Sequence, residues 1–363
     1  MAIRLYVGTY TTTLPHVQGK GEGIYLYDME PVSGRLTPRG VTPDVVNPSY
    51  LALDPRGRFL FAANEVSEID GQPGGAVSAF AIDPASGNLT FLNRQLTHGT
   101  APCYLCVDQT GQTVLVSNYG SGSVAAYRVG SDGRLSPSSD FIQHAAAEYN
   151  PKPPPGPHAH SVNIDHRNHF ALVADLGLDA ILVYRLDPVQ GKLTANDPPG
   201  ALLKKGAGPR HLALSPDGRF AYVINEQDST MTVFSYDEPR GILQEIQTVS
   251  TLPSDFSGRN TTADVHVHPS GRFVYGTNRG HNSLVIFAID PETGRLNLVG
   301  HESTQGRTPR NFAFDPNGRF LYAANQDSST IVTFRIDLAT GRLIPTGQVT
   351  EVPSPVCLKF AMV

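Results

Sequence analysis

The chain has 363 residues with a formal net charge of −5 at pH 7, and 40% of its residues are hydrophobic. The negative charge argues against nucleic acid or an anionic membrane as a partner, and no apolar run is long enough to span a bilayer. The first residues lack a basic-then-apolar leader. Three cysteines are an odd, small number for a disulfide framework, so we expect a cytoplasmic protein.

A short turn motif that ends in Gly-x-Leu recurs along the whole chain. The first copy reads Pro31-Val32-Ser33-Gly34-Arg35-Leu36. The glycines of the seven copies stand at positions 34, 87, 133, 191, 241, 294 and 341, between 46 and 58 residues apart. A period of this size, kept from end to end, is typical of a propeller that is built blade by blade.

One repeat shows the expected order of strands within a blade. The sequence from residue 209 predicts strands over 211–214, 220–224, 231–236 and 243–249. A Pro-Asp-Gly turn at 216–218 joins the first two strands, and Gly241 lies in the turn between the last two. Four strands in this order form an antiparallel meander, which is the blade of a propeller.

The first turn of the blade has six copies between residues 54 and 320, so the seventh blade must be shared between the two ends of the chain. We expect 355–360 to supply its innermost strand and 5–10 the next, because this pairing closes the ring without a free edge. The sequence therefore predicts an all-β, seven-bladed β-propeller of four-stranded antiparallel blades, as a single domain over 1–363. The best helical candidate, 145–149, precedes a Pro-rich run and forms at most one turn.

The two faces of such a propeller differ in their loops. The first and third turns of every blade share one face, and these turns are short and uniform. The blade-to-blade connections and the second-to-third loops share the other face, where the long insertions fall: 11–23, 66–75, 142–157 and 251–262. Varied loops on a rigid scaffold carry binding, so we expect the site on this face, at the mouth of the central channel.

Two positions in each blade frame that mouth: the residue before the inner strand and the pair that ends the second strand. We interpret the Asn that recurs in this pair as structural, whereas residues that depart from the repeat predict the site. The predicted catalytic residues are His160, Arg210, Glu226 and Arg279, and the predicted substrate-binding residues are His158, His211, His281, Arg310 and Asp175. Solvated loop charges are the alternative, but an Arg at an inner-strand start is poorly placed to reach bulk water.

Several Arg around a His favour an anionic small molecule as the partner, because guanidinium groups bind carboxylate or phosphate bidentately. A His can take a proton from water or give one to a leaving group. No third ligand accompanies the His158–His160 pair, and Cys103 and Cys106 would point to opposite faces of a strand. We expect no metal, no cofactor and no covalent serine route, and we interpret His266 and His268 as structural.

Several segments, in order along the whole chain, carry a family resemblance. They include Leu5-Tyr6-Val7-Gly8-Thr9-Tyr10, Pro157-His158-Ala159-His160, Gly208-Pro209-Arg210-His211, Val223-Ile224-Asn225-Glu226, Thr277-Asn278-Arg279-Gly280-His281 and Thr308-Pro309-Arg310-Asn311. Through them the chain resembles the seven-bladed propeller lactonases, which join propeller-type 6-phosphogluconolactonases with carboxymuconate lactonizing enzymes. The resemblance implies a His of the Pro-His-Ala-His segment as acid or base, with Arg210, Glu226 and Arg279 around it. We favour His160 over His158, because its register is level with Arg210 and Arg310.

For a lactonase we expect water to attack the ring ester carbonyl of 6-phosphogluconolactone, with His160 as base. Arg210 or Arg279 would stabilise the oxyanion, and the other, with Arg310, would hold the phosphate. Cycloisomerisation of a carboxymuconate is an alternative that uses the same residues without water. A non-catalytic ligand- or protein-binding propeller is a second alternative, although such a platform would tend to expose an apolar patch.

Overall fold

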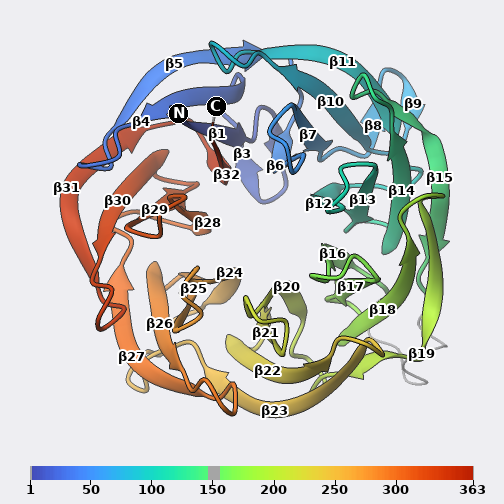
Figure 1. Ribbon diagram of the computed structural model, residues 1–363. Coiled ribbons are helices and arrows are strands. Elements are labelled where there is room, and N and C mark those ends of the chain that lie inside the picture. Colours follow the sequence, from blue (N-terminus) through green and yellow to red (C-terminus); the bar gives the residue numbers. More distant parts are fainter. Residues whose placement is uncertain (1, 146–155, 363) are drawn as a thin grey trace.

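The computed structural model describes residues 2–145 and 156–362, and these residues form strands and turns but no helix. Seven antiparallel sheets of four strands stand around a central axis (Figure 1), which confirms the predicted propeller. Within the described ranges, no helix is long and apolar enough to cross a membrane. The helical turn predicted at 145–149 lies, apart from Ala145, outside the described residues.

We number the blades from the first one that is continuous in sequence, and give their strands from the inside outward. Blade 1 has β6 (Pro48–Leu53), β7 (Phe59–Asn64), β10 (Ala76–Ile82) and β11 (Leu89–Leu96). Blade 2 has β12 (Pro102–Val107), β13 (Thr113–Asn118), β14 (Ser123–Val129) and β15 (Leu135–Gln143). Blade 3 has β16 (Ala159–Ile164), β17 (Phe170–Asp175), β18 (Ala180–Asp187) and β19 (Lys192–Leu202).

The next three blades follow the same meander. Blade 4 has β20 (Pro209–Leu214), β21 (Phe220–Asn225), β22 (Thr230–Asp237) and β23 (Ile242–Ser250). Blade 5 has β24 (Thr261–Val267), β25 (Phe273–Arg279), β26 (Ser283–Ile289) and β27 (Leu296–Ser303). Blade 6 has β28 (Pro309–Phe314), β29 (Phe320–Asn325), β30 (Thr330–Ile336) and β31 (Leu343–Glu351).

Blade 7 is shared between the two ends of the chain, as predicted. It consists of β32 (Pro355–Met362), β1 (Ile3–Thr9), β4 (Gly23–Met29) and β5 (Leu36–Pro43). β1 pairs antiparallel with β32, with Ile3 opposite Met362 and Val7 opposite Leu358. Both ends of the chain are thereby held in one sheet, and the ring closes without a free inner edge.

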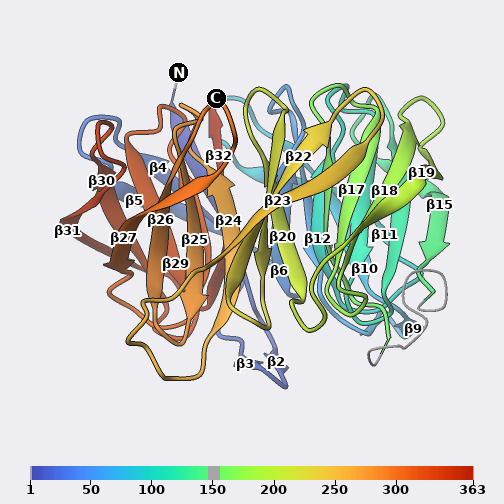
Figure 2. The ribbon, with the colours of Figure 1, turned by 90° about the horizontal axis from the view of Figure 1, so that it is seen from below.

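Two short hairpins extend from second-to-third loops. They are β2 (Thr13–Leu14) with β3 (Val17–Gln18), and β8 (Glu68–Ile69) with β9 (Gln72–Pro73). Figure 2 shows the β2–β3 hairpin projecting from the face opposite to the two chain ends. We call the face with these hairpins the loop face and the opposite one the turn face.

The Gly-x-Leu turns of the turn face pack one blade against the next. Gly294 has a φ of 71°, and a Cβ added to it would lie 2.3 Å from the ring of Phe220 in the preceding blade. The Tyr222 hydroxyl of that blade donates to the Gly294 carbonyl at 3.3 Å. Glycine is needed here both for its positive φ and for the close approach of the ring, so this motif joins blades and takes no part in the site.

Each inner strand contains a β-bulge near its loop-face end, and this corrects the predicted strand starts. In blade 4, Pro209 pairs with Asn225 and His211 with Ile224, so Arg210 is an extra, unpaired residue inside β20. Equivalent register shifts occur at Ser49, Cys103, His160, Arg310 and Val356, and between Thr262 and Val265 in blade 5. A bulge re-aims a side chain, so these residues lie within the strand rather than before it.

The Asn that ends most second strands is structural, as predicted. Asn64, Asn118, Asn225, Asn278 and Asn325 are fully buried. The Asn278 amide donates to the Thr251 carbonyl at 2.9 Å, and the Asn325 amide donates to the Thr304 carbonyl at 3.0 Å. These bonds tie the end of the fourth strand of one blade to the second strand of the next blade.

Candidate active site

A cavity of about 430 Å³ opens on the loop face, where the sequence placed the site. Four of the predicted site residues line it: His160, Glu226, Arg279 and Arg310. Further wall residues are Cys103, Glu65 and Tyr119, and the β2–β3 hairpin contributes Leu14, Pro15 and His16. Residues from all seven blades therefore meet around one space.

Glu226 is the centre of an ion-pair cluster in the wall. Its Oε2 accepts from Arg210 Nε at 2.9 Å and from Arg279 Nη2 at 3.0 Å. Burial raises the pKa of Glu226, but the charges of Arg279 and then Arg210 outweigh it and hold this pKa below its usual range. The carboxylate is thus ionised, and its Oε1 has no hydrogen-bond partner among the described residues.

Arg210 lies behind Glu226 rather than in the cavity wall. Its side chain is only 2% exposed, and it is absent from the residues that line the space. The structure therefore places Arg210 behind the cavity wall, whereas the prediction gave it a direct contact with a substrate. Because its Nε is bonded to Glu226, Arg210 acts on the cavity by holding that carboxylate in place.

His211 and Asp264 hold the Arg210 side chain in place through a chain of hydrogen bonds. Its Nη1 donates to His211 Nε2 at 3.0 Å, and His211 Nδ1 donates to Asp264 Oδ1 at 2.7 Å. A guanidinium can only donate, so His211 Nε2 is the acceptor and the ring is a neutral Nδ1–H tautomer. Burial, followed by the charge of Arg210, lowers the pKa of His211 to about 3. His211 therefore orients Arg210, and it is absent from the cavity wall, where the prediction gave it a contact with substrate.

Asp264 ends this chain of bonds in the interior. Its Oδ2 accepts from His266 Nε2 at 2.9 Å and from Asn311 Nδ2 at 2.5 Å. Burial raises the pKa of Asp264, but the charge of His266 and the hydrogen bonds from both imidazoles bring it well below its usual range. An ionised, buried carboxylate thus anchors a chain of hydrogen bonds from Asp264 through His211 and Arg210 to Glu226. His266 is bonded to the same carboxylate, but its side chain is 31% exposed, so it is not the core histidine that the sequence predicted.

His160 faces the cavity from the bulge of β16 and is 5% exposed. Burial, followed by the charge of Arg210, holds the pKa of His160 well below its usual range. The Cys103 thiol donates to the His160 carbonyl at 3.3 Å and lies 3.5 Å from His160 Nδ1. When the thiol hydrogen is directed to that carbonyl, the tautomer with its proton on Nδ1 faces the sulfur and leaves the Nε2 lone pair open to accept a proton.

Three predicted substrate-binding residues are outside the cavity wall. His158 stacks on Tyr119 at 4.8 Å between ring centroids and donates through Nδ1 to the Tyr119 carbonyl at 2.9 Å. Asp175 is fully buried and accepts from His144 and from the His158 backbone. His281 bonds Ser283 through Nδ1. The structure thus places these three outside the cavity wall, whereas the prediction gave them a contact with substrate, and His160 rather than His158 borders the cavity.

The opposite wall holds residues that the sequence analysis did not single out. Arg310 lies over the Tyr10 ring, with 5.3 Å from the guanidinium carbon to the ring centroid. The Tyr10 hydroxyl donates to Glu65 Oε2 at 2.8 Å, and His16 Nε2 is 3.3 Å from the same hydroxyl. Glu65 follows the second strand of blade 1 as Glu226 follows that of blade 4, which could have identified it. His16 lies in an insertion without a periodic signal.

The described residues contain no group of three or more His, Cys, Asp or Glu arranged to hold a metal ion. The cavity instead presents the imidazoles of His16 and His160, the ionised carboxylate of Glu226 and two guanidinium groups. Such a set can move a proton and stabilise negative charge on a small substrate.

Comparison with known proteins gives a family match over nearly the whole chain. The family model described as "Lactonase, 7-bladed beta-propeller" matches residues 4–360. A 6-phosphogluconolactonase of Bacillus subtilis is 37% identical over 98% of this chain and 97% of its own length. A 6-phosphogluconolactonase of Formosa agariphila is 32% identical over 86% of each chain. The solved structure of a periplasmic gluconolactonase of Pseudomonas aeruginosa is 36% identical, covers 100% of both chains, and has a TM-score of 0.91.

Proposed function

The chain belongs to the lactonase family of seven-bladed β-propellers, and on that premise we propose that it hydrolyses a sugar δ-lactone, 6-phosphogluconolactone, to 6-phosphogluconate. One observation carries the proposal: the neutral His160 shares a cavity with the guanidinium groups of Arg279 and Arg310. The name of the Bacillus subtilis relative supports the phosphorylated substrate. We further propose that the protein acts in the cytoplasm, which cell fractionation can test.

In the proposed reaction, His160 Nε2 takes a proton from water while the water oxygen bonds to the lactone carbonyl carbon. Negative charge then develops on the carbonyl oxygen, and Arg279 stabilises this charge. Arg279 lines the cavity and is one of the two arginines paired with Glu226. The tetrahedral intermediate collapses, the bond from carbon to ring oxygen breaks, and His160 returns its proton to that oxygen. The product is the open-chain carboxylic acid, which releases its proton to the solvent and becomes the carboxylate.

Glu226 and Arg310 bind rather than react in this scheme. The free Oε1 of Glu226 accepts from a sugar hydroxyl, because its Oε2 is already held by Arg210 and Arg279. Arg310 supplies positive charge for an anionic substituent, since it forms no ion pair among the described residues. Arg210 keeps Glu226 in position without touching the substrate.

The test is hydrolysis of 6-phosphogluconolactone, measured above its spontaneous rate, by the wild type, His160→Gln and the matched control His158→Gln. Loss of a general base lowers kcat by about 10² to 10⁴-fold, which is the effect expected for His160→Gln. Because His158 is outside the cavity wall, kcat of His158→Gln should fall by less than about tenfold. A folded His160→Gln protein with the normal rate would disprove the base assignment. Carboxymuconate and gluconolactone are assayed alongside, and a wild type that hydrolyses no lactone would refute the proposed function.

A further inference from the structure

A second lobe adjoins the candidate active site. It has a volume of about 380 Å³ and shares His16, Arg279 and Arg310 with the first cavity. Its other lining residues include Arg307, Asn282, Gln326 and Asp327, none of which borders the first cavity. We call the first cavity, with His160 and Glu226, the inner lobe, and this second one the outer lobe.

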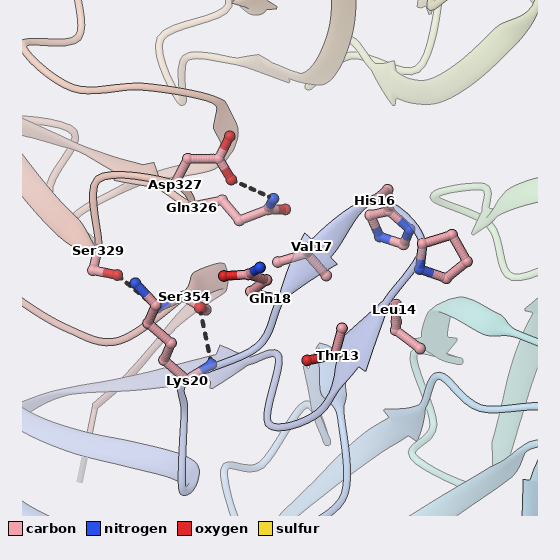
Figure 3. A pocket seen from close by; sticks show the side chains of 11 residues that line it. Thr13, Leu14, His16, Val17, Gln18, Lys20, Gln326, Asp327, Ser329 and Ser354 are labelled. Carbon is pink, nitrogen blue, oxygen red and sulfur yellow. Dashed lines mark hydrogen bonds between the residues drawn. The ribbon is translucent and has the colours of Figure 1, made fainter.

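The β2–β3 hairpin limits the outer lobe on one side. His16, next to the hairpin turn, borders both lobes and also a third cavity, of about 500 Å³, behind the hairpin. Figure 3 shows this third cavity, with Val17 and Gln18 of the hairpin on one side and Gln326 on the other. His16 thus borders all three cavities, and Gln326 and Asp327 border both the outer lobe and the third cavity. The outer lobe adjoins the inner lobe at Arg279 and Arg310.

The outer lobe is rich in positive charge that the protein does not neutralise. Arg307 is exposed, and like Arg310 it forms no ion pair within the described ranges. Asp327 is the one carboxylate in its lining, and both of its oxygens accept bonds, from Gln326 Nε2 at 2.8 Å and from the Thr308 hydroxyl at 2.5 Å. Burial, followed by the charge of Arg310, lowers the pKa of His16, which borders both lobes.

We propose that the outer lobe is a phosphate subsite, in which Arg307 and Arg310 bind the phosphate of the substrate while its lactone ring occupies the inner lobe. The inference rests on the proposed lactonase function. Guanidinium groups bind phosphate oxygens bidentately, and two of them border this lobe without a carboxylate partner. Arg307 lies only in the outer lobe, so it sets the preference for phosphorylated lactones separately from the chemistry at His160.

The experiment compares kcat/KM for 6-phosphogluconolactone and for gluconolactone in the wild type, Arg307→Gln and Arg307→Lys. We expect Arg307→Gln to lower the ratio of kcat/KM for 6-phosphogluconolactone to kcat/KM for gluconolactone about tenfold. This corresponds to about 1.4 kcal/mol of lost charge-assisted hydrogen bonding. The change should arise from a higher KM for the phosphorylated substrate. Arg307→Lys should lower it less, because the charge remains. Arg295→Gln, the same charge change in an exposed turn of the turn face, is the control and should leave the ratio as it is.

An unchanged ratio in Arg307→Gln, or an equal loss on both lactones, would overturn the subsite. If the wild type hydrolyses neither lactone, the proposed function fails, and binding then tests the subsite by itself. Calorimetric titration with 6-phosphogluconate and with gluconate should show that Arg307→Gln weakens only the phosphorylated ligand, again about tenfold. Equal affinity of the wild type for the two ligands would refute the subsite independently of catalysis.

Discussion

The two faces of the propeller are made from the same seven repeats, yet they differ in chemistry. The turn face has a cavity of about 410 Å³ beside His266, Phe314 and Phe360, close in size to the 430 Å³ cavity of the loop face. Volume therefore does not distinguish the faces. The loop face differs because its side chains change from blade to blade, whereas the turn face repeats one glycine turn, and the charged residues gather where the repeat is broken.

Asp264 joins the two faces in the interior. One of its oxygens holds His211, which supports the loop-face cluster through Arg210, and the other holds His266 on the turn-face side. If the chemistry is confined to the loop face, a substitution on the loop-face side of Asp264 should lower activity. An equivalent substitution on the turn-face side should lower mainly stability. Four predictions test this, from the largest expected effect on activity to the smallest.

Glu226→Gln should have the largest effect. It removes the charge that pairs with Arg210 and Arg279, and breaking a largely buried ion pair by removal of one partner costs about 3 to 5 kcal/mol. We expect kcat/KM for lactone hydrolysis to fall by about 10³-fold, together with a lower melting temperature. Glu65→Gln, which removes a wall carboxylate without an ion pair among the described residues, is the matched control, and an equal loss in both would contradict the central position of Glu226.

Asp264→Asn should lower activity through Arg210. Without the ionised carboxylate, the His211 tautomer that accepts from Arg210 Nη1 is no longer fixed, and we expect kcat to fall by about 10² with a smaller change in KM. His266→Gln removes the turn-face partner of the same carboxylate and should lower kcat less than about threefold. Equal losses of kcat in the two variants would mean that Asp264 acts only through stability.

The pH dependence of kcat/KM should show the buried environment of the base. Because the pKa of His160 is held well below 6.5 by burial and by Arg210, the free enzyme keeps a neutral base as pH falls through 6.5. The acid limb of kcat/KM, which reports the free enzyme, should therefore lie below pH 6.5. A limb at or above this pH would indicate a solvated histidine as the base instead of His160.

The fold could be predicted from the sequence because the same local signals recur in every blade. The turns with Gly and the Asn at strand ends each satisfy a backbone requirement, and Asn168 adopts a φ of 62° where other blades have Gly. Part of the site could be predicted because its residues break the repeat. His160, Glu226, Arg279 and Arg310 depart from the repeat, and all four line the inner lobe.

The rest of the site depends on side-chain direction, which strand register does not determine. Arg210 and His160 occupy the same bulge position in adjacent blades, but Arg210 turns inward because Glu226 and His211 both bond its guanidinium. Cys103 is buried, and the bulge of β12 aims its thiol at His160, a direction that strand register alone does not determine. His16 lies in an insertion, where no repeat predicts its neighbours.

Gly294→Ala should have the smallest effect on activity and a clear effect on stability. At its φ of 71° the new Cβ is strained and would meet the Phe220 ring at 2.3 Å, so we expect the free energy of unfolding to fall by about 2 to 3 kcal/mol. Gly347→Ala, with a φ of 77° and no atom within 4 Å of the added Cβ, isolates the backbone strain and should cost about 1 kcal/mol. Because the Gly294 turn is on the turn face, kcat/KM should stay at the wild-type value while denaturant midpoints shift. A loss of activity in folded Gly294→Ala would show that the turn face is coupled to the site, and the separation of the two faces would then be wrong.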